Sequence, residues 1–333
     1  MNFNFNNVID AFGGNTPLVK IYGANDYLLW EKPDFSGEYL TFEVLSNGNI
    51  TWNNASKHNA ISYSINNGSW TTITTTTTFA VSRGNKIRFK GENNSYYGDK
   101  FETTISFNLS GNIGSLVWGD NFSSGNYQFT PSNYFLGPMF SGCTGLVDAS
   151  KLQLPFEAVK YADYSGLFKG CTALLFPPEL PATSIGTERW EEEPYNWDGG
   201  FAYGSMFMDC TSLLYAPNLP AEYITQYCYD MMFAGCTSMV KGPEISAVCL
   251  PLEACYGMFA GCSNLNYIKC MATDFRNQAT YAWVGSYERE DEHTINIGEP
   301  VGVASNGTFI KASGATWYTG IDGIPTGWTV QNV

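Results

Sequence analysis

The sequence predicts a mainly β chain in which a two-sheet sandwich precedes a solenoid of short repeats closed by a β-structured cap. The motif Phe-x-x-Cys-x-x-Leu occurs five times, ending in Met once, with its cysteines at 143, 171, 210, 236 and 262. Short alternating segments separated by Gly and Asn turns precede these repeats. Aromatic residues make up 16 % of the chain and charged residues only 14 %, a mixture that favours strands and turns over long helices.

Residues 1–35 are predicted to form an N-terminal extension. It begins with an Asn-rich stretch and contains two apolar segments, 16–22 and 26–31. Two interpretations stay open, because the first residues carry too little apolar pattern to fold alone. The extension either lays its strands on the next domain or anchors the chain to a partner protein.

Residues 36–118 are predicted to form a compact sandwich of short strands. Residues 39–45 alternate, 46–49 turn and 50–52 return, while 60–65 and 69–73 flank an Asn-Asn-Gly hairpin turn. Further strands are expected at 79–81, 86–90, 106–109 and 113–118, with 79–81 and 86–90 as a pair across the turn at 83–85. Short strands at this spacing are typical of an immunoglobulin-like sandwich.

Residues 119–275 are predicted to form the repeat domain, with 119–136 capping its open first repeat. The motif cysteines are 28, 39, 26 and 26 residues apart, and a period in the twenties indicates a solenoid. One unit of this length cannot enclose a core, but stacked units can align Phe on Phe, Cys on Cys and Leu on Leu. Proline-rich stretches such as 176–182 are expected to be extended, and segments such as 222–233 to form a helical turn or two.

These repeats resemble the BspA-type leucine-rich repeats found in surface proteins of Bacteroidetes and in phages that infect them. The family pattern, Phe-x-x-Cys-x-x-Leu followed by Pro and then Leu-Pro, is met residue for residue in the second and third units. The resemblance covers roughly residues 135–275 and extends more loosely to the C-terminus. It implies a leucine-rich-repeat scaffold, in which residues 276–333 form the C-terminal β-cap. The stretch 63–70 with 87–91 and 110–116 is similar to the domain that often precedes such repeats.

Charge and hydropathy bear on partners and location. A net charge of −14 and a pI near 4.5 argue against nucleic acid and anionic membranes. No stretch approaches the roughly 18 apolar residues that span a bilayer, and the N-terminus does not resemble a secretory signal. A surface-type scaffold without such a signal is expected on a virion after synthesis in the host cytoplasm. The alternative location is a bacterial cell surface.

The nine cysteines do not predict a metal site or a cofactor. Five are motif positions, no Cys-x-x-Cys pair exists, and only two histidines are available as further ligands. The expectation is reduced, buried thiols, with no metal and no cofactor. Cys228 and Cys255 are the pair whose stacking is of interest.

Two acidic insertions are the candidate ligand-binding segments. Residues 186–198 carry five acids and one Arg, and residues 287–299 have the same balance. In repeat proteins, insertions map to loops that often lie on the binding face. Aromatic faces can stack on sugar rings while carboxylates accept hydroxyl hydrogen bonds. The alternative is that Trp190 and Trp197 only fix the loop to the repeats. The predicted ligand-binding residues are Trp190, Glu191, Glu193, Tyr195, Trp197 and Asp198.

The expected function is non-enzymatic. The sequence contains no nucleophile elbow, phosphate loop or zinc-protease motif, and carboxylate pairs such as Glu191 with Glu193 are common in any acidic chain. The leading hypothesis is a virion protein, a head or tail fibre or a decoration. It would contact other virion proteins through its N-terminal region and bind host-surface glycan or protein through the repeats. A bacterial adhesin is the second hypothesis and a glycosidase the third; a homotrimer is one assembly open to a fibre.

Overall fold

The computed structural model describes residues 20–22, 28–31, 37–96, 98–123, 136–156, 158–186, 200–276, 278–289 and 295–333. The chain divides into two compact units, Met1–Phe35 and Ser36–Val333. In the first unit, β1 (Lys20–Tyr22) pairs antiparallel with β2 (Leu28–Glu31).

The second unit is mainly β. Its helical elements in the described part are the four-residue α1 (Ser115–Trp118) and the 3-10 turn η3 (Gly119–Asn121). No helix in the described ranges is long and apolar enough to cross a membrane. The remaining strands are β3 (Leu40–Val44), β4 (Gly48–Asn53), β5 (Ile61–Ile65), β6 (Thr71–Ile73), β7 (Thr77–Val81), β8 (Lys86–Gly91), β9 (Lys100–Glu102), β10 (Phe107–Asn112), β11 (Leu146–Gln153), β12 (Ala158–Val159), β13 (Ser184–Ile185), β14 (Glu244–Ile245), β15 (Cys249–Leu250), β16 (Tyr267–Cys270), β17 (Asp274–Phe275), β18 (Gly285–Arg289), β19 (Ile295–Val301), β20 (Thr308–Lys311) and β21 (Thr329–Asn332).

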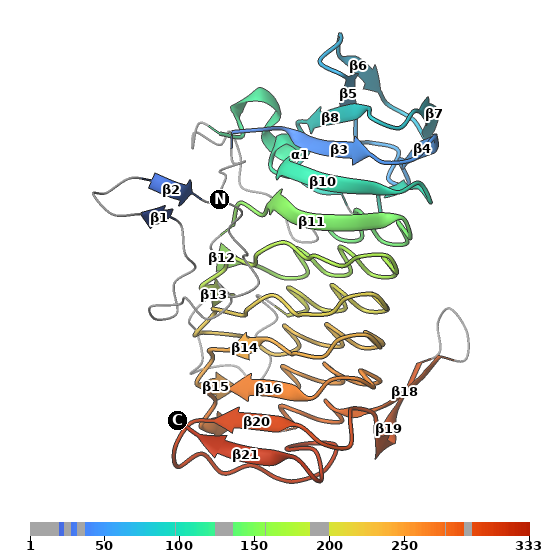
Figure 1. Ribbon diagram of the computed structural model, residues 1–333. Helices are drawn as coiled ribbons and strands as arrows, with labels where there is room; N and C mark the ends of the chain where they lie inside the picture. Colours follow the sequence, from blue (N-terminus) through green and yellow to red (C-terminus); the bar gives the residue numbers. More distant parts are fainter. Residues whose placement is uncertain are drawn as a thin grey trace. The chain divides into compact units, whose positions relative to one another are not determined.

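Two facing sheets enclose the core of the N-terminal part of this unit (Figure 1). One sheet has the order β11-β10-β3-β8-β5-β6 and the other β7-β4-β9. The predicted hairpin of β5 and β6 is confirmed, with Asn66 and Asn67 at positive φ in its turn. Within the longer connection these two residues form a β-turn that the Gly68 N–H closes by donating to Ile65 O at 2.9 Å, and a positive φ at both central residues is typical of its type I′ form.

Three of the predicted details in this region are wrong. Residues 39–45 and 50–52 do not form a hairpin, because β3 and β4 belong to different sheets and β4 pairs with β7 and β9. The predicted pair of 79–81 with 86–90 fails in the same way, since β8 pairs with β3 and β5. Residues 113–118 are not a strand but include α1. The turns at 46–49 and 83–85 were predicted correctly, but each of these two turns carries the chain to the opposite sheet.

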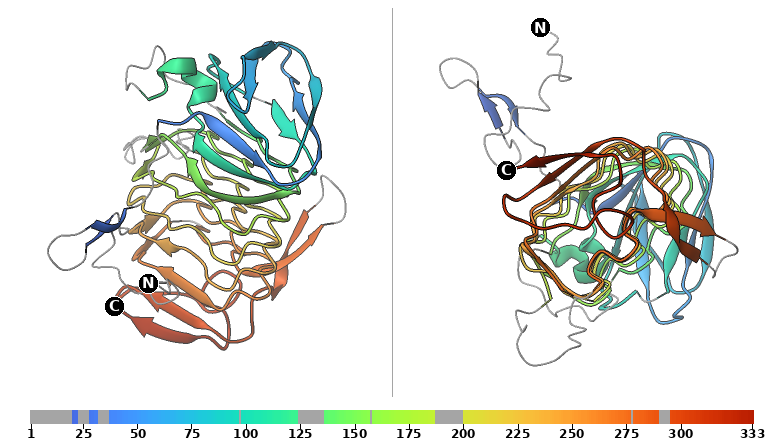
Figure 2. Two further views of the ribbon diagram at one scale, coloured as in Figure 1. Left: turned by 45° about the horizontal axis from the view of Figure 1, so that its top comes forward. Right: turned by 90° about the horizontal axis from the view of Figure 1, so that it is seen from below.

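From residue 136 onward the chain winds into coils that lie one over the next (Figures 1 and 2). We number coils 1 to 5 by their motif cysteines, Cys143, Cys171, Cys210, Cys236 and Cys262. Alternate amide groups join neighbouring coils: Phe168 N–H donates to Met206 O at 2.9 Å and Gly170 N–H to Met208 O at 2.8 Å. The amides between them close turns within the coil, as Lys169 N–H does to Gly166 O at 3.0 Å. The backbone N–H groups of residues 166–170 therefore all have partners, as a buried backbone requires.

The helical turn predicted for residues 222–233 is wrong; the chain there forms consecutive turns. A residue in the left-handed region recurs every fourth position, which a right-handed helix does not tolerate. In coil 4 these positions are Tyr227 (φ 57°), Met231 (φ 46°) and Gly235 (φ 76°). The equivalent positions in the other full coils are Ala162, Gly166, Gly170, Phe201, Ser205, Asp209, Glu253, Gly257 and Gly261.

The predicted Phe ladder is present through the stack. Phe140, Phe168, Phe207, Phe233 and Phe259 are fully buried, and each ring stacks on the next with centroids 5.5–6.0 Å apart and planes within 16°. The motif cysteines are fully buried beside them, and each thiol donates to a Phe carbonyl of the preceding rung, as Cys236 does to Phe207 O at 3.1 Å. All nine cysteines are free thiols.

The ladder continues into both flanking regions. Phe101 of β9 stacks on Phe140 at 6.0 Å and 9°, and its carbonyl accepts the Cys143 thiol at 3.3 Å. At the other end Trp283 lies against Phe259 at 57°, which ends the parallel stacking. Strands β16, β20 and β21 continue as a parallel sheet, so the predicted C-terminal cap contains further pairing strands. One hydrophobic core therefore runs from the sandwich to the C-terminal residues.

Candidate binding face

The ligand-binding residues predicted in the first insertion lie outside the described residues. Trp190, Glu191, Glu193, Tyr195, Trp197 and Asp198 all fall within 187–199. The second insertion is described except for 290–294, and it forms the antiparallel hairpin of β18 and β19. Tyr287 of this hairpin donates to Asp209 Oδ1 at 3.0 Å, and Tyr287 and Ile297 pack against Met208, Ala234 and Ala260. The described part of this insertion thus packs on the coils.

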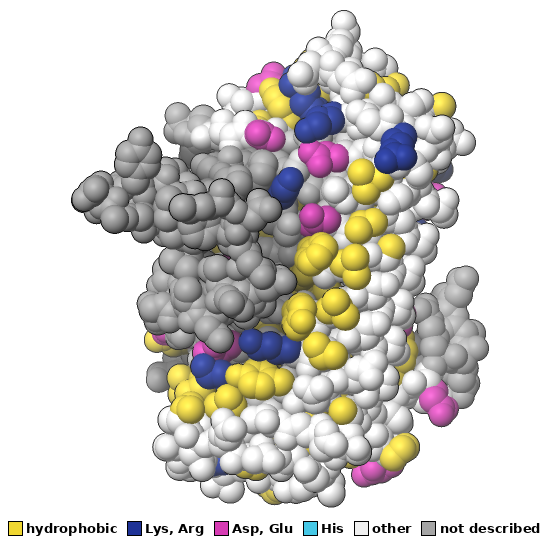
Figure 3. Space-filling view, in the orientation of Figure 1, with side chains coloured by type: hydrophobic (Ala, Val, Ile, Leu, Met, Phe, Trp, Pro, Cys, Tyr) yellow, Lys and Arg dark blue, Asp and Glu magenta, His cyan; other side chains and the backbone are white. Residues whose placement is uncertain are grey.

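An exposed stripe on the stack is the binding face that the structure itself offers. Phe176 of coil 2 and Tyr215 of coil 3 are 53 % and 55 % exposed. Each lies two residues after the Leu of its motif, where coils 4 and 5 carry Lys241 and Tyr267. We call these four residues, together with the exposed Leu214 beside Tyr215, the front stripe. Figure 3 shows hydrophobic side chains running down this face across successive coils.

Backbone pairing holds the members of the front stripe in register. Residue 148 bridges residue 176, and residue 215 bridges residue 241, both in parallel. The carbonyl of Tyr267 accepts the N–H of Gly242 at 2.9 Å, which fixes coil 5 beside coil 4. Strand neighbours lie about 4.8 Å apart, so the stripe offers one side chain at each such step. Lys241 Nζ lies 5.2 Å from the centroid of the Tyr267 ring, a cation–π distance.

The sequence contained a signal for this stripe that composition and insertions did not reveal. The position two residues after the motif Leu or Met reads Asp148, Phe176, Tyr215, Lys241 and Tyr267 through the five coils. The motif Phe, Cys and Leu or Met, which face the core, are apolar in every coil. Large aromatic residues at an outward position of an extended segment are unusual enough to mark a contact surface.

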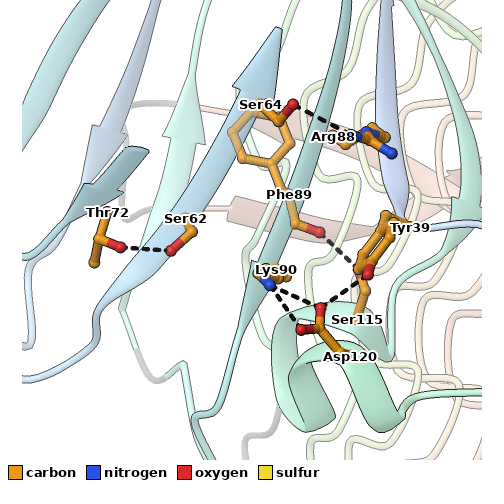
Figure 4. A network of polar contacts seen from close by, with 9 residues as sticks. All are labelled: Tyr39, Ser62, Ser64, Thr72, Arg88, Phe89, Lys90, Ser115 and Asp120. Carbon is orange, nitrogen blue, oxygen red and sulfur yellow. Dashed lines mark hydrogen bonds and ion pairs between the residues drawn. The ribbon is translucent and has the colours of Figure 1, made fainter. Parts of the chain in front are cut away.

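A second group of aromatic and charged side chains, mostly half-buried, lies on the outer face of the six-stranded sheet (Figure 4). Lys90 on β8 forms an ion pair with Asp120 at 2.7 Å, and the Tyr39 hydroxyl donates to the same carboxylate at 2.8 Å. The hydrogen bond from Lys90, with that from Tyr39, holds the pKa of Asp120 below its ordinary value. Trp70 covers this group, with Lys90 Nζ 4.6 Å from its ring centroid.

A cavity of about 640 Å³ lies near the C-terminal end of the stack. Its walls combine aromatic and polar side chains, among them Arg276, Tyr281, Glu299, Trp317, Tyr318 and Asp322. Arg276 is already paired with Asp274 at 3.2 Å, and Asp322 Oδ1 accepts the N–H of Ala282 at 2.6 Å. These two charged groups are therefore occupied by contacts within the protein.

The buried titratable groups of the stack serve packing rather than chemistry. Burial raises the pKa of the Cys143 thiol, and of the Cys270 thiol outside the motif, to about 12, and it raises the pKa of the other four motif cysteines well above the ordinary value. Thiols of this kind are poor nucleophiles because the thiolate is the reactive form. In the described part of the chain, no three Cys, His, Asp or Glu side chains are grouped so as to hold a metal ion.

Comparison with known proteins gives no relative for this chain: no protein-family model, no curated protein and no solved structure matches it.

Proposed function

We propose that this chain is a non-enzymatic binding protein whose stacked coils present the front stripe to a glycan or protein on a host-cell surface. The observation that carries the proposal is the recurrence of large rings at one motif position, with Phe176 and Tyr215 exposed in coils 2 and 3 and Tyr267 half-buried in coil 5. The rings at this solvent-facing position, present in three of the five coils, do not contribute to the core, which the Phe ladder already fills.

The fold assignment belongs to the same proposal. The two facing sheets support an immunoglobulin-like domain, and the motif spacing with coil-on-coil pairing supports a leucine-rich-repeat solenoid of the BspA type. The coils differ from most leucine-rich repeats in using consecutive turns where a helix is usual. In this proposal the repeats are a rigid support and the stripe is the variable part, as in other solenoids with extended binding surfaces.

A glycan chain is the ligand that the stripe suits best. Rings of Phe and Tyr can stack on the faces of sugar rings, and Lys241 between Tyr215 and Tyr267 can donate to hydroxyl groups. Rigid aromatic side chains also lose little conformational entropy on binding. The loop 186–198 is proposed as a second contact, since it follows coil 2 in sequence and carries two Trp and a Tyr.

We place this function on a phage virion, as a head or tail fibre or a decoration, with residues 1–35 contacting other virion proteins. The support is the resemblance of the repeats to those of Bacteroidetes and their phages. A bacterial adhesin would use the same face. Mass spectrometry of purified virions separates the two locations, and light scattering of the full chain distinguishes a monomer from a fibre-like homotrimer.

The test of the binding face is a double variant, Phe176→Ala with Tyr215→Ala, compared with Tyr318→Ala as the control. Tyr318 is 83 % exposed and lies near the C-terminus, away from the stripe motif. Fluorescently labelled chain is incubated with a panel of Bacteroidetes strains, and bound protein is quantified by flow cytometry. The double variant should lose binding at unchanged stability while the control keeps it; equal binding by all three chains would refute the role of the stripe.

Deletion of residues 188–198 tests the loop in the same assay. Loss of binding would assign a contact to the loop, and undiminished binding would remove it from the proposed site. Incubation with host polysaccharide, followed by measurement of released reducing ends, tests the non-enzymatic assignment, which predicts none.

A further inference from the structure

Strand β8 carries three cations on the outer face of its sheet, and only two of them are neutralised. Lys86 pairs with Glu43 at 3.0 Å and Lys90 pairs with Asp120 at 2.7 Å. Arg88 lies between them, and no described carboxylate pairs with it.

The donors of Arg88 are almost unused. Its one hydrogen bond runs from an Nη atom to Ser64 Oγ at the long distance of 3.3 Å, as Figure 4 shows. Its Nε is buried and has no hydrogen-bond partner among the described residues. A guanidinium offers five N–H donors in a planar fork, so this group keeps most of its capacity. The buried Nε is out of reach of an outside partner, so the donors that a ligand could use are those of the two Nη atoms.

Aromatic rings and hydroxyl groups surround this guanidinium. Its central carbon lies 5.2 Å from the Trp70 ring centroid and 5.6 Å from that of Tyr39. Further along the same face the hydroxyls of Ser62 and Thr72 lie 2.8 Å apart on β5 and β6 (Figure 4). We call Tyr39, Ser64, Trp70 and Arg88 the Arg88 cluster. Figure 3 shows Lys and Arg side chains together with Asp and Glu side chains over the β3 and β8 region.

We propose that the Arg88 cluster binds the carboxylate of an acidic sugar. The guanidinium fork matches a carboxylate with two parallel N–H donors, a geometry that the point charge of a lysine cannot provide. The faces of Trp70 and Tyr39 give a sugar ring an apolar surface, and the nearby Ser and Thr hydroxyls can exchange hydrogen bonds with sugar hydroxyls. An acidic peptide would also pair with the Arg88 guanidinium, but it would leave the hydroxyls of Ser62 and Thr72 without a role.

This site does not depend on what binds the front stripe, because the two surfaces share no residue. The cluster lies on β5, β8, the residue before β3 and the turn before β6, whereas the stripe lies on coils 2 to 5. Binding at one can therefore be abolished without the other.

The test uses tetragalacturonate as the probe and its methyl ester as the matched ligand, which keeps the sugar rings and masks the carboxylates. Affinity is measured by isothermal titration for the full chain, Arg88→Gln and Lys86→Gln. Lys86→Gln is the matched control, since it removes a cation from the same strand and face. Arg88→Gln and the ester should each weaken binding at least about tenfold, the effect of losing a charge-assisted pair, while Lys86→Gln leaves it unchanged.

Further measurements separate the alternatives. Arg88→Lys keeps the charge and should bind with intermediate affinity, and melting temperatures show whether each variant is folded. The Phe176→Ala, Tyr215→Ala chain should bind tetragalacturonate normally. The proposal is overturned if the wild-type chain does not bind the probe, if Lys86→Gln weakens binding as much as Arg88→Gln, or if the ester binds equally well. Tighter binding of tetraglutamate would also overturn it in favour of a peptide ligand.

Discussion

The sandwich and the stack of coils bury the same kinds of side chain in different ways. In the sandwich, Phe42 meets Phe89 at 60°, Phe101 at 61° and Phe107 at 13°, so each contact has its own geometry. In the stack, each Phe meets the next at 16° or less. The aromatic contacts in the sandwich core therefore differ from one another, whereas those in the stack repeat one geometry. A change in the stack therefore alters two identical interfaces at once.

The backbones differ as strongly as the cores. In the sandwich, non-glycine residues with positive φ are confined to turns, at Lys57, Asn66 and Asn67. In the coils they recur every fourth residue and include bulky side chains such as Phe201 and Tyr227. The left-handed conformation costs an L-residue about 1–2 kcal/mol, so hydrogen bonds within and between coils must offset it repeatedly. The stack is thus a strained backbone that neighbouring coils hold in place.

The largest expected effect on stability comes from removing one ring from the middle of the Phe ladder. Phe207 is fully buried between Phe168 and Phe233, with both centroids 5.5 Å away. Phe207→Ala should lower the free energy of unfolding by about 4 kcal/mol, because it removes a whole ring and leaves a cavity open to two coils. Urea unfolding followed by circular dichroism measures the loss. Phe176→Ala, at an exposed position, is the control and should change stability by less than about 0.5 kcal/mol.

The second effect tests whether the two regions are one structure. Gly145 lies where coil 1 meets the sandwich, and its carbonyl accepts the N–H of Phe107 at 3.1 Å. A Cβ at this position would lie 1.9 Å from the carbonyl oxygen of Ile105, which is backbone and cannot rotate away. Gly145→Ala should therefore cost about 3 kcal/mol through a shifted β10–β11 pairing. The variant should unfold in one transition if the regions are coupled; two separate transitions would show that they are independent.

The sequence predicted the parts of the fold that depend on repetition. The Phe and Cys ladders follow from a motif read five times, and the Asn-Asn-Gly hairpin follows from turn chemistry. The helical turn was predicted wrongly because the left-handed positions are glycine in only some coils, as at Gly166 and Gly257, and Ser205 and Met231 in others. No local propensity marks Met231 as left-handed; contacts between coils impose it. The sheet partners of β4 and β8 were missed because a turn has the same residues whether it returns or crosses.

The candidate site was less predictable than the fold. The insertion 186–198 was predicted to bind ligand because its charge and Trp content interrupt the repeat, yet residues 187–198 lie outside the described residues. The front stripe was readable at one motif position but required knowing which positions face outward. The Arg88 cluster could not be found from sequence, because Tyr39, Trp70 and Arg88 are distant along the chain and meet only across the sheet.

The sandwich and the stack also differ in how their buried carboxylates are accommodated. Asp99 in the sandwich accepts hydrogen bonds from Ser56 N–H at 2.8 Å, Ser56 Oγ at 2.9 Å and Asn59 Nδ2. Asp230 in coil 4 is only 7 % exposed, and no described residue donates a hydrogen bond to its carboxylate. Burial, with the nearby charge of Glu253, raises the pKa of Asp230 to about 7. The sandwich satisfies its buried acid with hydrogen bonds, whereas burial favours the protonated form of Asp230 in the stack.

This difference gives the coils a pH dependence. Between about pH 4 and pH 7 the folded chain holds a proton on Asp230 that the unfolded chain releases, so the unfolding free energy falls as pH rises. Asp230→Asn carries no titrating group and should be more stable than the wild-type chain at pH 8 by on the order of 2 kcal/mol, with little difference near pH 4. Thermal unfolding at both pH values measures this. A constant difference across pH would contradict the assignment.

The smallest effect measures the backbone strain of the coils without disturbing their core. Gly170 and Gly235 occupy equivalent left-handed positions, with φ of 73° and 76°. A Cβ on Gly170 would meet nothing closer than 3.8 Å, whereas one on Gly235 would lie 2.5 Å from Asp209 Oδ1 and 3.1 Å from the Tyr287 ring. Gly170→Ala should therefore cost only the conformational penalty, about 1 kcal/mol, and Gly235→Ala about twice as much because the β18 hairpin must move. Equal losses in urea unfolding would contradict this prediction, because they would mean that the hairpin moves away from Gly235 at no cost in free energy.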